Sequence, residues 1–186
     1  QIDCGERGFS FRQDAKVDMR MDKSSSFSAY DVLNEYKEEE LARVIKDYGE
    51  EKFAYKIANS IVNKRNTEKI ETTIQLADII ASCYPAAARR DGNPARKCFQ
   101  ALRIAVNDEL GSLERALDSA FDLLNKGGVL SIITFHSLED RIVKLRFKEY
   151  CTGCTCPPDF PVCVCGKTPR GKKYSKKPIE PSTEEL

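Results

Sequence analysis

The sequence predicts an α/β fold that carries a separate helical block. The glycine pair Gly127-Gly128 is followed by residues 129–133, a Val, Leu and Ile-rich run of the kind found in fully buried strands. Helical patterns stand before and after this run, and a helix that leads into a buried strand and then into another helix is typical of α/β proteins. A chain of 186 residues is long enough for one such domain with an insertion.

Residues 24–93 are predicted to form the helical domain. Residues 1–27 show no sustained period, and we expect a loop with short local structure there. From Ser28 onward, apolar residues recur at helical spacing in four groups. These groups are Val32, Leu33 and Tyr36; Leu41, Val44, Ile45 and Tyr48; Phe53, Ile57 and Ile61; and Leu76, Ile79, Ile80 and Cys83. The second helix is expected to stop at Gly49, and the fourth to be capped by Thr72 or Thr73.

Residues 94–150 are predicted to form the α/β segment, after a polar linker over residues 89–93. A long helix is expected from Pro94 to Asn125, with a bend or break at Gly111, followed by the strand and a helix over residues 138–150. Residues 151–186 are rich in Cys, Pro and Lys and have no helical period, so they form a separate C-terminal segment.

Composition excludes a membrane protein and indicates a cytoplasmic one. Hydrophobic residues make up 41% of the chain and charged residues 32%, which is ordinary for a globular protein. No run approaches the ~18 apolar residues of a membrane span, and nothing resembles a signal peptide. The net charge of +1 conceals a basic run without acidic residues near the C-terminus. Its members are Lys167, Arg170, Lys172, Lys173, Lys176 and Lys177, which suit phosphate contacts or a solvated tail.

Five of the eight cysteines lie between residues 151 and 165. Without a secretory signal, this clustering favours a metal site or reduced thiols over a disulfide framework. Four thiolates in pairs suit tetrahedral zinc. The expected ligands are Cys151, Cys154, Cys163 and Cys165, with Cys156 able to replace one of them. Free thiols and disulfides remain alternatives, and Cys4, Cys83 and Cys98 are expected to be ordinary small residues.

A polar and aromatic cluster, Phe135-His136-Ser137, follows the predicted strand. Ligands of open α/β sheets bind at the carboxyl ends of the strands, so this cluster is a candidate site. His136 is also the only histidine of the chain. The alternative is a strand-to-helix turn in which His136 satisfies backbone groups, and spacing alone does not separate the two.

Five sequence blocks carry a resemblance to a known family. They are Gly5-Glu6-Arg7-Gly8-Phe9-Ser10-Phe11, Asp18-Met19-Arg20-Met21-Asp22, Tyr48-Gly49-Glu50-Glu51-Lys52-Phe53, Phe99-Gln100-Ala101-Leu102-Arg103-Ile104 with Val106-Asn107, and Phe135-His136-Ser137-Leu138-Glu139-Asp140-Arg141. In this order they resemble the bacterial 16S ribosomal RNA cytosine-N4 methyltransferase family (RsmH, also called MraW), over residues 1–186. The chain departs from the family at Asn93, where a histidine is usual, and the cysteine-rich segment is not general to it.

The resemblance implies a Rossmann-like S-adenosylmethionine methyltransferase core interrupted by a helical domain, with residues 1–23 as the core loop after the cofactor strand. It implies methylation of the N4 amine of a cytidine in 16S ribosomal RNA, with the small ribosomal subunit as partner. Gln1 matches a family residue that contacts the cofactor. The family's first strand, glycine-rich loop and ribose-binding acid would precede Gln1, so we expect a piece of a longer protein that alone binds S-adenosylmethionine weakly or not at all.

The resemblance also implies roles for individual residues. Phe135 would stack on the target base, and His136 and Ser137 would accept a proton or contact the base edge. The expected RNA contacts are Arg7, Arg20, Lys167, Arg170, Lys172 and Lys173. An ion-pair cluster with Asp18 and Asp22 is the alternative for Arg20, and packing is the alternative for Phe9 and Phe11. The main rival function is a non-catalytic RNA-binding module with a zinc-knuckle-like tail, and a helical protein-interaction domain is the third hypothesis. The sequence leaves the oligomeric state open, a homodimer included.

Overall fold

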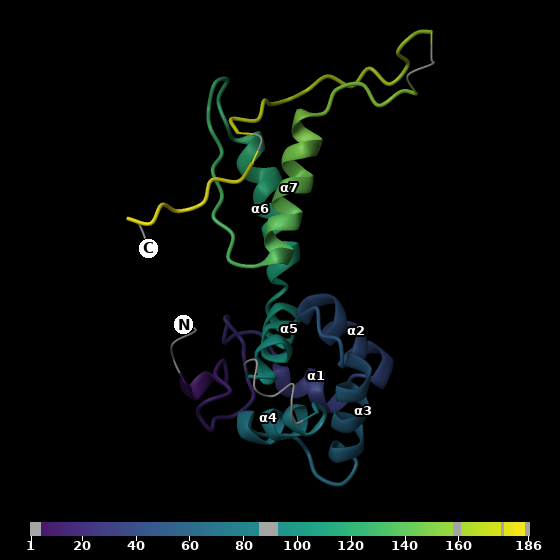
Figure 1. The fold of residues 1–186 in the computed structure, drawn as a ribbon, viewed down its shortest axis with the longest axis vertical. Helices are drawn as coiled ribbons and strands as arrows, with labels where there is room; N and C mark the ends of the chain where they lie inside the picture. Colours follow the sequence, from purple (N-terminus) through teal and green to yellow (C-terminus); the bar gives the residue numbers. More distant parts are fainter. Residues whose placement is uncertain (1–4, 86–92, 158–160, 176, 185–186) are drawn as a thin grey trace. The chain divides into compact units, whose positions relative to one another are not determined.

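The computed structural model describes residues 5–85, 93–157, 161–175 and 177–184. The chain divides into two compact units, Gln1–Gly111 and Ser112–Leu186 (Figure 1). The regular secondary structure described in both units is helical, and one antiparallel bridge between Lys16 and Thr72 is the only β-type pairing among the described residues. Of the helices described, none combines the length and the apolar character that a membrane span requires.

The first unit contains a short 3-10 turn, Gly5–Arg7, and five α-helices. The helices are α1 Ala29–Glu35, α2 Glu38–Gly49, α3 Ala54–Arg65, α4 Thr73–Ser82 and α5 Ala95–Asn107. Helix α2 packs against both α3 and α5. Each of the four apolar groups in the sequence supplies fully buried side chains to one core, among them Leu33, Leu41, Ile45, Ile57, Ile61, Leu76 and Ile80.

Local sequence explains how helix α4 begins and how helix α2 ends. Thr72 is the N-cap of α4: its hydroxyl accepts from the Gln75 amide at 3.4 Å, while the Gln75 side chain accepts from the Thr72 amide at 3.1 Å. Helix α2 does stop at Gly49, but the left-handed residue is Glu50, with φ 48°. Gly49 has a different role, because a Cβ there would lie 2.7 Å from the carbonyl oxygen of Lys97 on α5. Glycine therefore permits the close contact between α2 and α5.

The predicted long helix from Pro94 to Asn125 is broken into α5 and α6 (Glu109–Asp122), and the break lies at Asp108 and not at Gly111. Asp108 has φ 45° and caps α5. Gly111 leaves room for the Asp108 carboxylate, which occupies the space that a Cβ at Gly111 would take. Helix α5 contacts α1, α2 and α4, so the structural division differs from the predicted boundary at residues 93/94.

The second unit is built on α6, which crosses the division at Gly111, and α7, Ser137–Cys151. The two helices lie side by side (Figure 1). Phe121 of α6 stacks on Tyr150 of α7 with ring centroids 3.9 Å apart, and the Tyr150 hydroxyl donates to the Asp118 carboxylate at 2.6 Å. Leu117 on α6 and Leu138 on α7 are buried.

The described structure does not confirm the predicted buried strand over residues 129–133. These residues form no strand, and Val129 and Ile133 are 74% and 81% exposed. A strand is completed by hydrogen bonds to a neighbouring strand, and the described residues pair no segment with this one. Burial nevertheless alternates, with Leu130 and Ile132 half-buried between exposed neighbours. This is the period of two that a strand shows when one of its faces is covered.

Candidate functional site

His136 is the N-cap of helix α7 and directly precedes Ser137, the first residue of that helix. The imidazole Nδ1 lies 3.5 Å from the Glu139 amide, from which it accepts, and the Glu139 carboxylate accepts from the amides of Phe135 at 2.8 Å and His136 at 3.3 Å. This reciprocal pattern is a capping box, which stabilises the first turn of a helix. The structure therefore shows the turn-stabilising role that the sequence left as the alternative for His136.

The capping contacts also define the hydrogen-bonding character of the imidazole. Because Nδ1 accepts a hydrogen bond, a neutral His136 ring carries its proton on Nε2. Nε2 is buried and makes no hydrogen bond within the described residues, with Glu139 Oε1 at 3.5 Å. The neutral imidazole thus has one N–H group available as a donor.

Phe135 and Ser137 flank this cap and are both exposed. The Phe135 ring is 89% exposed although it is large and apolar. The exposed face of this ring is available for stacking on a base. The structure brings Phe135, His136 and Ser137 together within one turn, as their sequence order requires, and their catalytic roles stay predictions.

Arg20 is held by internal contacts in the first unit. Its guanidinium binds the Asp18 carboxylate through two hydrogen bonds of 2.8 and 2.7 Å, and it donates to the Ser25 carbonyl at 2.6 Å. Hydrogen bonding from Arg20 lowers the pKa of Asp18 below its usual value. The ion-pair alternative for Arg20 is therefore the one that the structure shows, although Asp22 instead binds Ser24.

Arg7 is likewise occupied by protein groups. Its guanidinium donates to the carbonyl oxygens of Arg20 and Met21, the second at 3.0 Å, and lies 5.5 Å from the centre of the Phe9 ring. Phe11 packs edge-on against Phe99 with ring centroids 5.7 Å apart. Phe9 and Phe11 are packed against the core, as the packing alternative holds. A phosphate contact by Arg7 or Arg20 stays a prediction that would require exchange of these bonds.

Asn107 joins two of the sequence blocks that carry the family resemblance. From the end of α5, its amide donates to the Met19 carbonyl at 2.8 Å and accepts from the Met21 amide at 2.6 Å. Asn107 also donates to the Arg103 carbonyl at 2.8 Å. No local pattern predicts a role for this side chain, because Met19 and Met21 are 88 and 86 residues away from it in the sequence.

The basic run begins where the chain returns to α7. The amides of Arg170 and Gly171 both donate to the Tyr150 carbonyl, at 2.8 and 3.1 Å. The Arg170 guanidinium lies 4.9 Å from the centre of the Phe121 ring and binds the Asp122 carboxylate. Arg170 thus anchors the segment, whereas Lys167, Lys172 and Lys173 are exposed. RNA binding by all four residues stays a prediction.

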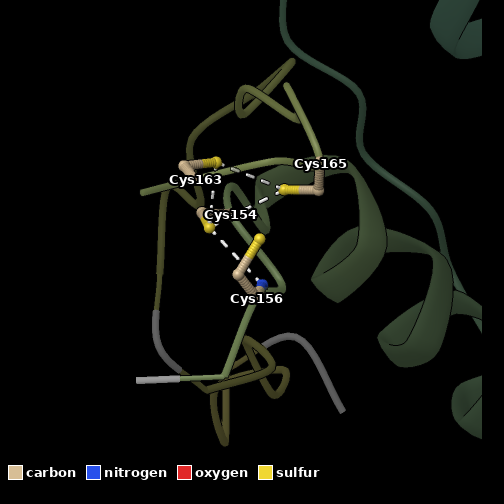
Figure 2. Close-up of side chains that lie close together, drawn as sticks. All are labelled: Cys154, Cys156, Cys163 and Cys165. Atoms are coloured by element: carbon tan, nitrogen blue, oxygen red, sulfur yellow. Dashed lines mark hydrogen bonds between the residues drawn. The ribbon is translucent and has the colours of Figure 1, made fainter. Parts of the chain in front are cut away.

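Four cysteine sulfurs converge in the C-terminal segment (Figure 2). They belong to Cys154, Cys156, Cys163 and Cys165, and all four lie within 4.8 Å of one another. Cys154 and Cys163 are 3.3 Å apart, Cys163 and Cys165 3.6 Å, and Cys154 and Cys165 3.7 Å. Backbone amides of Lys167 and Thr155 directed at the Cys165 sulfur lower the pKa of that thiol to about 5.

The predicted ligand set needs one correction, because Cys156 and not Cys151 completes the cluster. Cys151 is the last residue of α7, and its sulfur lies near Gly171. Cys151 lies in the last turn of α7, whereas the other four cysteines of the segment lie beyond the end of this helix. Cys83 and Cys98 are buried in the first unit, in keeping with small core residues. Gln1, the predicted cofactor contact, and Cys4 lie outside the described residues.

Comparison with known proteins gives one consistent result. A family model described as "MraW methylase family" matches residues 1–186. The chain is 58% identical over 185 residues to "Ribosomal RNA small subunit methyltransferase H" of Clostridium botulinum (strain Loch Maree / Type A3). It is 56% and 54% identical over 187 residues to proteins of the same name from Symbiobacterium thermophilum and Paenibacillus sp. (strain JDR-2). The alignments cover 100% of this chain and 59–60% of each relative, so the chain spans about 60% of the length of these relatives.

Proposed function

The chain belongs to the MraW methylase family, and we propose that the protein containing it transfers a methyl group from S-adenosylmethionine to the N4 amine of a cytidine in 16S ribosomal RNA. The observation that carries this proposal is the family match over residues 1–186, together with relatives named as methyltransferases of the small-subunit ribosomal RNA. The alternative of a non-catalytic RNA-binding module is not favoured by these relatives. The small ribosomal subunit is then the partner and the cytoplasm the place of action.

The chemistry requires three things from the protein. The N4 lone pair of cytosine is delocalised into the ring, so the amine must be held in line with the methyl group and must lose a proton. The base must also leave its stack and be clamped on its face and edge. S-adenosylmethionine supplies an activated methyl group on a sulfonium. The described residues offer no nucleotide cradle and Gln1 lies outside them, so we assign none of them to the cofactor.

The residues at the start of α7 are suited to bind the flipped base. The exposed ring of Phe135 would stack on the flipped cytosine. The Nε2–H group of His136 would donate to an acceptor on the base edge, because Nδ1 is already engaged by Glu139, and this contact requires the buried Nε2 to become accessible when RNA binds. Ser137, whose hydroxyl can accept as well as donate, would accept a hydrogen bond from the amine during methyl transfer, and the proton that the amine loses would pass to solvent. The hydrogen bonds of the capping box fix the backbone of Phe135 and His136 at the start of the helix.

The Rossmann-like core belongs to this proposal as well. The alternating burial of residues 129–136 fits a strand that has one face packed and lacks its neighbours. We infer that neighbouring strands come from the part of the relatives' length that this chain does not span. Residues 129–133 would then become an inner strand, which places Phe135 at its carboxyl end, where α/β enzymes bind ligands. Residues 24–93 would be the inserted domain, and a homodimer is compatible with this arrangement.

A pair of variants at His136 in the full-length protein tests the assignment. His136→Ala removes both the imidazole and the cap, whereas His136→Asp removes the hydrogen-bond donor and keeps a favoured N-cap. We expect both variants to lower single-turnover methylation of 16S ribosomal RNA by about 100-fold or more. Only His136→Ala should lose stability, by about 0.5–2 kcal/mol. Cofactor affinity should stay unchanged in both.

Two results would contradict the proposal. Normal single-turnover rates in stably folded His136→Asp would leave His136 with a capping role alone. A wild-type protein that binds 16S ribosomal RNA and S-adenosylmethionine but methylates no cytidine would support the RNA-binding module instead. Mass spectrometry of nuclease-digested RNA identifies N4-methylcytidine directly.

A further inference from the structure

We propose that Cys154, Cys156, Cys163 and Cys165 bind one zinc ion as a tetrathiolate site with a structural role. Zinc–sulfur bonds of about 2.3 Å in a tetrahedron place the sulfurs about 3.8 Å apart. The sulfurs of Cys154, Cys163 and Cys165 are separated by 3.3, 3.6 and 3.7 Å, and the Cys156 sulfur lies within 4.8 Å of each of them. Figure 2 shows the four side chains facing a common centre. The cluster therefore already has nearly the spacing that the ion requires.

The protein around the cluster gives no other reason for this convergence. Residues 152–169, which we call the cysteine loop, contain no helix or strand in their described part. Val162 and Val164, the apolar neighbours of Cys163, are 69% and 74% exposed, so they contribute no core. A segment of this length without secondary structure or buried apolar surface needs another source of order. A bound metal supplies it, because metal binding and folding are then coupled.

The compactness of the cluster selects a single ion. All four sulfurs lie within 4.8 Å of one another, which leaves space for one metal atom and none for a group of several iron and sulfide atoms. Thiolates are soft ligands, so an all-sulfur tetrahedral site favours zinc over calcium, magnesium or manganese. With four protein ligands the site is closed, and a closed zinc site is structural.

Protein contacts among the described residues join the two ends of the cysteine loop, and the metal would hold the residues between these ends. At these ends, the amides of Arg170 and Gly171 donate to the Tyr150 carbonyl, and the Arg170 guanidinium covers the Phe121 ring. Zinc would hold the far part of the loop, and Cys165 is two residues from Lys167. The ion therefore fixes the path by which the chain enters the basic run. Its loss should loosen the cysteine loop and leave α6 and α7 intact.

Metal analysis of the full-length protein, purified under reducing conditions, tests the site and its ligands. Wild type should contain about one zinc per chain, and cobalt should give the intense visible bands of a tetrahedral thiolate complex. Cys154→Ser, Cys156→Ser and Cys163→Ser should each lose most of the zinc and these bands. Cys151→Ser is the matched control, since Cys151 lies in the same segment but outside the cluster, and it should keep both.

Proteolysis provides the second readout. Trypsin should cut after Lys167 about tenfold faster in Cys154→Ser, or in wild type treated with a strong zinc chelator, than in Cys151→Ser, while the helical circular dichroism signal stays the same. The proposal is overturned by a reduced wild-type protein without zinc, by iron in its place, or by a Cys154–Cys163 disulfide in protein isolated with alkylation from cells. Loss of zinc in Cys151→Ser with retention in Cys156→Ser would overturn the ligand set.

Discussion

The side-chain amide of Asn107 donates a hydrogen bond to the carbonyl oxygen of Met19, at 2.8 Å and across 88 residues of sequence. Met19 is fully buried and has φ 58°, a left-handed conformation that a side chain rarely adopts. Asn107 also accepts a hydrogen bond from the Met21 amide, so it holds the backbone on both sides of Arg20. The end of α5 thus fixes the loop that contains Asp18 and Arg20.

Asn107→Ala should destabilise the protein by about 1–3 kcal/mol, because the partly buried backbone groups of Met19 and Met21 lose their partner. Asn107→Asp should be no milder, since a carboxylate can accept from the Met21 amide but cannot donate to the Met19 carbonyl. Urea unfolding measures both variants. Asn63→Ala, on an exposed face of α3, should stay within about 0.5 kcal/mol of wild type. An Asn107→Ala variant as stable as that control would show that the loop containing Asp18 and Arg20 keeps its conformation without Asn107.

Gly49→Ala tests the contact between α2 and α5. The new methyl group would lie 2.7 Å from the Lys97 carbonyl oxygen and 3.3 Å from the Ala101 Cβ, so the helices must separate. We expect a loss of about 1–3 kcal/mol, although alanine has the better helix propensity. Thermal unfolding compares it with Asp47→Ala on the exposed side of the same helix. A gain in melting temperature for Gly49→Ala would mean that propensity outweighs the steric clash.

The Asp18–Arg20 pair predicts a pH dependence of stability. The pKa of Asp18 is lowered in the folded state, mainly by hydrogen bonding from Arg20. Its contribution is therefore present above the unfolded pKa of about 3.9 and is lost as pH falls through the lower folded value. Asp18→Asn should be less stable than wild type at pH 7, and the difference should shrink at pH 3. Melting temperatures across this range provide the measurement. An Asp18→Asn curve parallel to that of Asp47→Asn would contradict the prediction.

Phe135 offers a test of stacking that stability does not confound. The ring is exposed, so Phe135→Ala should change the free energy of unfolding by less than about 0.5 kcal/mol. Stacking of a base on an aromatic side chain contributes about 1–3 kcal/mol, so methylation in the full-length protein should fall roughly 5- to 150-fold. Phe135→Tyr keeps the ring face and should restore most of the rate. Equal loss in the Ala and Tyr variants would argue against stacking, and Tyr174→Ala serves as an exposed aromatic control.

Local patterns predicted the helices well because their hydrogen bonds and apolar faces lie within a few residues. The groups around Leu33, Ile57 and Ile80 are all buried on helices at the expected positions. Residues 129–133 show the limit of such patterns. Their composition is that of a strand, but strand formation depends on a neighbouring strand, and the described chain provides none.

The same limit applies to individual contacts. Asn107 gives no sign in the sequence that it binds Met19, since only the folded chain brings the two together. The thiol cluster was predicted with three correct members, because spacing limits which cysteines can meet. The fourth depended on where α7 ends, and this helix carries Cys151 away from the cluster. The break at Asp108 depended on its carboxylate lying over Gly111, a fit that no helical period encodes.

The double hydrogen bond to the Tyr150 carbonyl has an evolutionary consequence. Because Arg170 and Gly171 return to the residue that the chain left at the end of α7, the cysteine loop is an excursion whose two ends nearly meet. Such an excursion can be gained, lengthened or deleted without moving the helices on which it stands. A descendant chain could replace it with a short turn and keep the stack of Phe121 on Tyr150. The loop is thus a module that selection can add to or remove from an otherwise unchanged helical pair.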